Sequence, residues 1–242
     1  MAKARAFLTS LFIIFLSGVL SLVAIATMPL SPRGDLYLAI ARVWAKIIFW
    51  FGGIELRTQL SPELDLSQRY LYLSSHESLT DILALFAALP QKVVMVAKRS
   101  LLILPIFSWG MWLAGFVFIN RKDRASAYKS MHDAGKLVRK GRSVLVFPEG
   151  TRGDGGELQK FKRGGFVLAQ AAKIPVVPVG IVGTRDVLPR DHFCVFPGRI
   201  AVCVGRPIEP PPDPMTDEQL VAWMAQVRAE VEKLRQQARS MW

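Results

Sequence analysis

The stretch Leu71-Tyr72-Leu73-Ser74-Ser75-His76-Glu77-Ser78-Leu79-Thr80-Asp81 passes from an apolar run through a polar turn into a helix start. The run from residue 69 to 73 has the length and composition of a short buried strand. A histidine and an aspartate five positions apart do not share a helical face. His76 in a strand-to-helix turn and Asp81 in the first helical turn can nevertheless point at each other, as a general base with its orienting carboxylate. An isolated pair at this spacing also fits a loop histidine and an ordinary helix-start carboxylate.

The composition indicates membrane contact and an anionic partner. Hydrophobic residues make up 51% of the 242 positions, which is above the usual range for a purely soluble protein. The net charge is +12, and residues 91–173 hold 16 Lys and Arg against 5 Asp and Glu, an excess of +11. Nucleic acid, anionic lipid headgroups and a phosphate-bearing substrate all fit such a segment. Cys194 and Cys203 lack metal-ligand spacing, so we expect buried free thiols and no metal site.

The first part of the chain is predicted to be a membrane-docking helix pair. Residues 6–28 are almost wholly apolar and would form a helix of about 35 Å, long enough to cross a bilayer core. We expect an uncleaved membrane helix, with a signal peptide as the alternative. Residues 36–51 are apolar but carry Arg42 and Lys46 on one face, which indicates a helix lying in one leaflet. A second crossing stays open, and residues 1–58 are taken as the first unit.

The second unit, residues 59–242, is predicted to alternate strands with helices. Strands are expected at 69–73, 93–97, 116–119, 144–147, 176–182 and 200–204, the last at a sheet edge, and helices at 79–88, 123–140, 164–172 and from 216 onward. Residues 100–120 carry no charge, but Pro105, Gly110 and Gly115 interrupt them, so we expect a broken segment that does not span the bilayer. The predicted fold class is α/β, with a mostly parallel central sheet flanked by helices and the N-terminal membrane-docking helix pair.

Four motifs follow one another between residues 70 and 184. They are the HxxxxD stretch from His76 to Asp81, Ala97-Lys98-Arg99 with Ile119-Asn120-Arg121, Phe147-Pro148-Glu149-Gly150-Thr151-Arg152, and Val177-Pro178-Val179-Gly180-Ile181. A Pro-acid-Gly turn after a buried strand is where an open α/β sheet presents ligand groups. In this order the motifs resemble those of the membrane-bound glycerolipid acyltransferases, specifically the 1-acyl-glycerol-3-phosphate (lysophosphatidate) acyltransferases.

The resemblance implies transfer of a fatty acyl group from acyl-CoA or acyl carrier protein to the sn-2 hydroxyl of lysophosphatidic acid, giving phosphatidic acid. His76 would remove the hydroxyl proton while Asp81 holds the imidazole, with no acyl-enzyme and no cofactor. The residues implied to bind substrate are Lys98, Arg121, Glu149, Gly150, Thr151 and Arg152. The fork of Arg152 suits a phosphate. Glu149 is expected to orient Arg152 or the glycerol hydroxyls, with a pKa lowered by cationic neighbours.

Several alternatives stay open. The family commonly has Asn before the catalytic histidine where this chain has Ser75, so a lyso-lipid without a phosphate, such as a lyso-ornithine lipid, is an alternative acceptor. Ser78 is an alternative, acylated nucleophile. Lys160, Lys162 and Arg163 fit donor phosphates, the leaflet surface or a solvated loop. The rival class is a non-catalytic, membrane-anchored anion-binding protein.

The motifs also constrain topology. If residues 100–120 crossed the bilayer, His76 and Arg152 would lie on opposite sides of a hydrocarbon layer about 30 Å thick. We therefore expect residues 60–242 on one face of a bacterial-type inner membrane, the cytoplasmic face, because thioester donors are made there. The expected partners are the bilayer, a lipid substrate and the acyl donor, with no nucleic acid.

Overall fold

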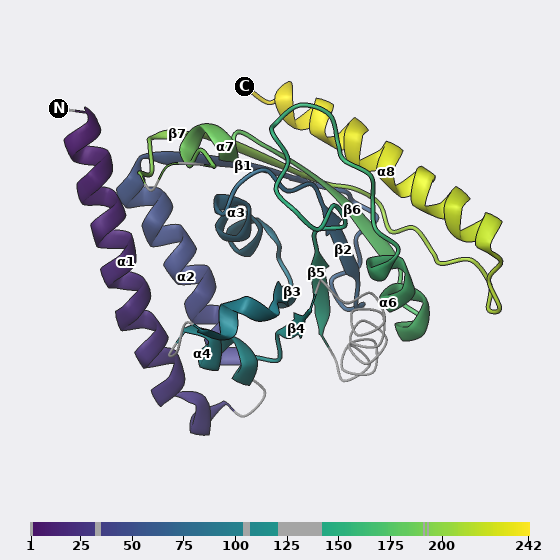
Figure 1. Cartoon of the computed structure of the whole chain (residues 1–242), viewed down its shortest axis with the longest axis horizontal. Coiled ribbons are helices and arrows are strands. Elements are labelled where there is room, and N and C mark those ends of the chain that lie inside the picture. Colours follow the sequence, from purple (N-terminus) through teal and green to yellow (C-terminus); the bar gives the residue numbers. More distant parts are fainter. Residues whose placement is uncertain (1, 32–34, 104–106, 121–141, 191, 193) are drawn as a thin grey trace.

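The computed structural model describes residues 2–31, 35–103, 107–120, 142–190, 192 and 194–242 (Figure 1). Within these residues seven strands form one sheet in the order β1-β7-β6-β2-β5-β3-β4. The strands are β1 Ile54–Leu60, β2 Leu71–Ser74, β3 Val93–Lys98, β4 Val117–Ile119, β5 Ser143–Val146, β6 Val176–Val182 and β7 Gly198–Val204. All neighbouring pairs are parallel except β6 with β7. The predicted α/β class with a mostly parallel sheet is confirmed.

Helices cover both faces of the sheet. They are α1 Ala2–Ala26, α2 Asp35–Gly52, α3 Thr80–Ala88, α4 Phe107–Leu113, α6 Gly164–Ala172, α7 Thr184–Val187 and α8 Asp217–Arg239, with short 3₁₀ turns at Met28–Leu30 and Arg99–Ile103. In Figure 1 the helices α1 to α4 lie on one side of the sheet, and α6 and α8 lie on the other. Because both faces are covered, every residue of β2, β5 and β6 is buried, which explains their continuous apolar runs.

The predicted edge position of residues 200–204 is wrong. β1 pairs in parallel with β7 along its whole length, from Ile54 opposite Gly198 to Leu60 opposite Val204, and takes the edge. β1 was not predicted because its sequence, IELRTQL, is mostly polar and exposed, as edge strands often are. The division into residues 1–58 and 59–242 stays a prediction, and β1 runs across that boundary. The helix predicted at 123–140 lies outside the described residues.

The prediction that residues 100–120 form a broken segment is confirmed for the described part, but Gly110 lies within a helix and does not interrupt it, and Pro105 lies outside the described residues. The described part of this segment holds a 3₁₀ turn, the seven-residue helix α4 and strand β4, which pairs with β3. Gly110 lets α4 lie against α2, because a Cβ there would stand 2.6 Å from Cε2 of Tyr37. Trp109 and Trp112 point their apolar surface outward. The segment is thus part of the folded body, with an apolar outer surface.

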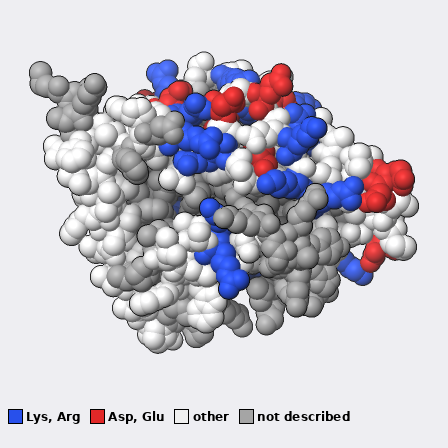
Figure 2. All heavy atoms as spheres, in the orientation of Figure 1, with Lys and Arg blue, Asp and Glu red and all other residues white. Residues whose placement is uncertain are grey.

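Polar contacts join α1 to α2 and fasten α1 to the body. Trp44 Nε1 of α2 donates to Ser17 Oγ of α1 at 3.1 Å, and the backbone N–H of Val195 donates to Ser10 Oγ of α1 at 3.0 Å. Residues 6–26 form the stretch of the described chain that is long and apolar enough to cross a membrane, by length and composition alone. Figure 2 shows few charged atoms at the left of the molecule, where α1 and α2 lie, whereas charged side chains gather along the top.

Arg42 of α2 reaches the helix that carries Asp81. Its guanidinium donates to the carbonyl oxygens of Phe86, Leu89, Pro90 and Gln91, at and just after the C-terminal end of α3. These carbonyls have no partner within the helix and carry the negative end of its dipole. A cation placed there satisfies them, so α2 is bound to α3 by its own side chain.

Candidate active site

His76 and Asp81 meet as predicted. His76 Nδ1 lies 2.7 Å from Asp81 Oδ2. The Asp81 side chain is fully buried, whereas 12% of the His76 side chain is exposed. The same Asp81 oxygen accepts the backbone N–H groups of Glu77 at 2.7 Å and Ser78 at 3.0 Å. A carboxylate bound to Nδ1 fixes the tautomer with Nδ1 protonated, which leaves Nε2 free to accept a proton.

The turn after β5 holds His76 from the other side. The imidazole stacks on the ring of Phe147, with centroids 3.9 Å apart and an interplanar angle of 13°. The His76 backbone N–H donates to Glu149 Oε1 at 2.9 Å, and its carbonyl oxygen accepts the N–H of Gly153 at 2.7 Å. Both the ring and the backbone of His76 are therefore positioned by residues about seventy positions later in the chain.

Glu149 holds backbone N–H groups of two loops and, in the described structure, does not orient Arg152 as predicted. Its second oxygen, Oε2, accepts the backbone N–H of Gln159 at 3.1 Å, and only 4% of the residue is exposed. Burial raises the pKa of Glu149, and the two backbone hydrogen bonds offset this only in part. The predicted lowering by cationic neighbours is wrong. Glu149 also forms no ion pair with Arg152 in the described structure, so its observed contacts join two loops.

The residues after Glu149 form a turn covered by a lysine. Gly150 has φ of 76°, which favours glycine, and a Cβ there would stand 2.6 Å from Lys162 Nζ. Thr151 Oγ1 donates to Gln159 Oε1 at 3.2 Å. Arg152 is half-buried and has no ion pair within the described part of the chain. The cations of Arg152 and Lys162 are thus both placed on this turn.

The other basic residues predicted to bind substrate do not contact the His76 turn in the described structure. Lys98 is exposed at the carboxyl end of β3, which lies two strands from β2 in the sheet. Parallel strands end at the same edge, so Lys98 shares the edge of His76 and Arg152 without a bond to either. Arg121 lies outside the described residues. Arg163 forms an ion pair with α8, because its Nη1 lies 2.9 Å from Oδ1 of Asp217, the first residue of that helix.

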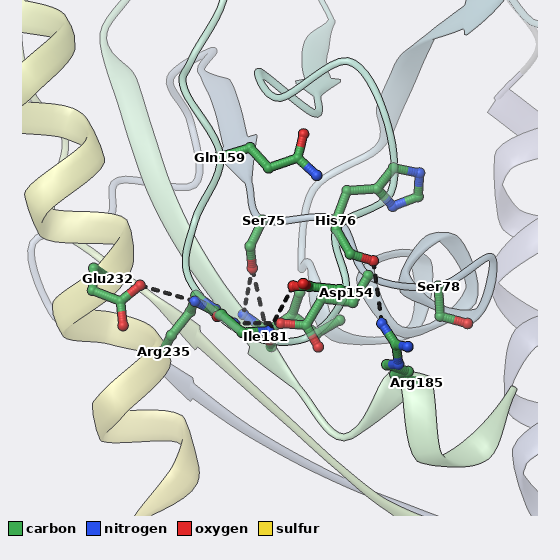
Figure 3. Close-up of polar contacts among 12 residues, drawn as sticks. Ser75, His76, Ser78, Asp154, Gln159, Ile181, Arg185, Glu232 and Arg235 are labelled. Carbon is green, nitrogen blue, oxygen red and sulfur yellow. Dashed lines mark hydrogen bonds and ion pairs between the residues drawn. The ribbon is translucent and has the colours of Figure 1, made fainter. Parts of the chain in front are cut away.

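Two serines beside His76 are occupied by hydrogen bonds, and Figure 3 shows those of Ser75. Ser78 Oγ is buried between Thr80 Oγ1 and the carbonyl oxygen of Leu188, each at 2.8 Å. That environment does not present it as a nucleophile. Ser75 Oγ exchanges two long contacts of 3.4 Å with the backbone of Ile181 on β6. The serine in place of the family's usual asparagine therefore bonds to the sheet.

The described residues hold no cluster suited to a metal ion. No group of three or more His, Cys, Asp and Glu side chains among them could share one. Both cysteines are free as predicted; Cys203 is buried, but Cys194 is only half-buried.

One buried residue was missed by the sequence reasoning. Arg235 of α8 is 2% exposed, and its Nη2 donates to Glu77 Oε1 at 2.5 Å and to the carbonyl oxygen of Gly156 at 3.0 Å (Figure 3). Its Nη1 donates to Glu232 Oε2 at 2.9 Å. α8 reaches this depth because β6 carries Gly180, where a Cβ would stand 2.4 Å from the Arg235 backbone nitrogen. A charged residue on the apolar stripe of the helix was the available signal.

The fold and the site define an α/β protein with a His–Asp pair at the carboxyl edge of its sheet. The chain belongs to the Acyltransferase family, whose model matches residues 54–182. The matched segment ends with β6, so α8 and Arg235 lie beyond it.

Named relatives support this membership, and a solved structure has the same fold. Human 1-acyl-sn-glycerol-3-phosphate acyltransferase alpha is 31% identical over 86% of this chain and 74% of its own length. Human 1-acyl-sn-glycerol-3-phosphate acyltransferase beta is 38% identical over 54% of this chain. The chain spans about half of that relative, 47%, and 65% of a Chlamydomonas reinhardtii relative. The crystal structure of the 1-acyl-sn-glycerophosphate (LPA) acyltransferase PlsC from Thermotoga maritima matches the fold with a TM-score of 0.79 at 24% identity, covering 97% of this chain and 98% of that one.

We predict that Arg235→Met destabilises the protein by about 3–5 kcal/mol, because it leaves the Glu77 carboxylate buried without its cation. Burial raises the pKa of Glu77 and Arg235 opposes that rise. Without Arg235 the native state binds more protons than the unfolded chain, so stability falls as pH rises above the unfolded value of about 4.5.

Denaturant unfolding across pH measures this loss. Glu77→Gln combined with Arg235→Met should recover part of the stability and remove the pH dependence that Glu77 contributes. Lys233→Met is the matched control, since its side chain is 74% exposed on the same helix. Equal stability of Arg235→Met and Lys233→Met would contradict the assignment.

Proposed function

We propose that this protein transfers a fatty acyl group from a thioester donor to the sn-2 hydroxyl of lysophosphatidic acid, giving phosphatidic acid in phospholipid biosynthesis. The observation that carries the proposal is His76, held by a buried carboxylate beside a turn that carries Arg152 and is covered by Lys162. The relatives named as 1-acyl-sn-glycerol-3-phosphate acyltransferases support the choice of acceptor. The donor is acyl-CoA or acyl carrier protein.

The proposed reaction is a direct transfer. His76 Nε2 accepts the proton of the acceptor hydroxyl as its oxygen attacks the thioester carbonyl carbon. The carbon–sulfur bond then breaks, and the leaving thiolate takes the proton back from the imidazolium. Asp81 stabilises that imidazolium through Nδ1. The hydrogen bonds around Ser78 support a path without an acyl-enzyme.

The acceptor phosphate is proposed to bind at the turn after β5. Gly150, Thr151, Arg152 and Lys162 form this surface, and Glu149 keeps it next to His76. Lys98 and Arg121 are proposed to contribute further positive charge. A phosphate bound to Arg152 would supply the anion that its guanidinium lacks among the described residues. A lyso-lipid without a phosphate is the alternative acceptor, and it would leave that cation unpaired.

The proposed location is the cytoplasmic face of a bacterial-type inner membrane. Exposed apolar side chains on α1, including Phe7, Ile14 and Phe15, support docking into lipid, together with Trp109 and Trp112 of α4. The bond between Ser10 and Val195 holds the N-terminal third of α1 against the body. That contact favours a helix embedded beside the body over one that leaves it to cross the bilayer.

Replacing His76 tests the chemistry. We expect His76→Ala to reduce acyl transfer about 10²- to 10⁴-fold, or about 3–5 kcal/mol of barrier, because the general base is lost. Asp81→Asn should also be severely impaired, since a neutral amide supports the wrong tautomer. Thiol release from acyl-CoA and from acyl carrier protein, with lysophosphatidic acid as acceptor, measures both. His192→Ala, at an exposed site, is the control, and more than half of wild-type turnover in His76→Ala would sink the assignment.

Replacing Arg152 tests the acceptor. We expect Arg152→Ala to raise the KM for lysophosphatidic acid. The loss of one charge-assisted contact should cost about 1.5–3 kcal/mol of acceptor binding. The KM for the donor should stay the same, and the preference over a phosphate-free lyso-lipid should shrink. Arg206→Ala, an exposed arginine away from the site, serves as the comparison. A changed donor KM with an unchanged acceptor KM would move Arg152 to the donor.

Topology is tested by labelling. Single cysteines at Gln68 and Asp154, in a background without Cys194 and Cys203, should both react with a membrane-impermeant thiol reagent from the cytoplasmic side only. Both positions are exposed and belong to the same folded body. Reaction of the two from opposite sides would overturn the proposed membrane arrangement.

A further inference from the structure

A cavity of about 480 Å³ opens at the carboxyl end of β6, one strand from the His76 turn. Three elements supply its cationic walls: Arg185 comes from α7, Arg199 from β7 and Arg239 from the last residue of α8. Trp242 closes one side, and the guanidinium of Arg199 lies 5.1 Å from its ring centroid. We call this cavity the arginine pocket.

In the described structure the guanidinium groups of the arginine pocket are not held in ion pairs. None of its three arginines forms an ion pair within the described residues. The carboxylates that line it are Glu77, Asp154 and Asp186. Glu77 is already bound by Arg235, and neither Asp154 nor Asp186 forms an ion pair with Arg185, Arg199 or Arg239 among the described residues. Like charges gathered in one cavity repel each other, and a bound anion relieves that repulsion.

The pocket lies on the other side of His76 from the proposed acceptor site. In the sheet, β2 stands between β5, which carries the Glu149–Arg152 turn, and β6, which ends at the pocket. Glu77 and Gly155 line the cavity, so the His76 turn and the loop after Arg152 form its wall. A transfer reaction needs a second substrate that approaches the same histidine. The geometry leaves the β6 side for that donor.

The charge and size of the pocket favour coenzyme A over acyl carrier protein as the carrier of the acyl group. Guanidinium groups bind phosphate oxygens in pairs of hydrogen bonds. The volume falls in the range of small-molecule sites, and a recess of this kind does not admit a folded carrier protein. In Figure 2 charged side chains gather along the top of the molecule, above the mostly uncharged surface at the left, which suits a water-soluble ligand. Building on the proposed function, we propose that the arginine pocket binds the phosphorylated nucleotide of coenzyme A.

Direct binding tests the proposal without turnover. The probes are coenzyme A and adenosine 3′,5′-bisphosphate, titrated calorimetrically into protein carrying His76→Ala. Adding Arg199→Gln and Arg239→Gln, both at exposed positions, should weaken binding at least about 10-fold, the lower bound for one lost charge-assisted contact. The matched control adds Arg206→Gln and Lys233→Gln, which remove the same charge elsewhere and should leave binding unchanged.

Kinetics with the otherwise wild-type protein give a second reading. The Arg199→Gln, Arg239→Gln variant should raise the KM for acyl-CoA, leave the KM for the acceptor unchanged, and lose discrimination against an acyl thioester of dephospho-coenzyme A. Equal effects in both double variants would overturn the proposal. Unchanged nucleotide binding in the Arg199→Gln, Arg239→Gln variant would also overturn it. The same holds if this variant changes only the reaction with acyl carrier protein thioesters, or only the partition of the protein onto anionic vesicles.

The two proposals fail separately. If the wild-type protein transfers no acyl group to lysophosphatidic acid from either donor, the proposed function fails. Loss of bisphosphate binding in the Arg199→Gln, Arg239→Gln variant would still support the arginine pocket in that case. If transfer is normal and the double variant binds the nucleotide like wild type, only the pocket assignment fails.

Discussion

The site depends on one buried oxygen, Oδ2 of Asp81. It accepts three hydrogen bonds, from the imidazole of His76 and from the backbone of Glu77 and Ser78. The other oxygen, Oδ1, is buried without a hydrogen-bond partner among the described residues. The interactions that offset the cost of burying this carboxylate are therefore concentrated on Oδ2. Any rotation of the side chain would disturb the turn and the histidine together.

The rest of the fold keeps that turn in place from three directions. The turn after β5 holds the backbone and ring of His76. From the opposite face of the sheet, α8 sends Arg235 to Glu77 and to the loop at Gly156. Arg42 of α2 binds the far end of α3, so the apolar helix pair and the helix carrying Asp81 form one connected unit. Docking of that pair on a bilayer would therefore orient the site relative to the lipid.

Sheet order assigns the proposed substrates to separate sides. His76 follows β2, near the middle of the sheet, with the turn of Arg152 on the β5 side and the arginine pocket on the β6 side. Strands that run parallel present their following loops at one edge, which is why residues so far apart in the chain can face two ligands around one histidine. The antiparallel entry of β7 brings Arg199 to the same edge.

Local patterns determined what the sequence alone could predict. The spacing of His76 and Asp81, the periods of α6 and β6, and the turn at Gly115 act over a few residues, and each was predicted correctly. Tertiary structure decided the rest. The polar strand β1 is fixed by pairing with β7, and the raised pKa of Glu149 comes from desolvation in the assembled core. Arg235 meets Glu77 across 158 positions, a contact that no local pattern encodes because only close packing of α8 on β6 creates it.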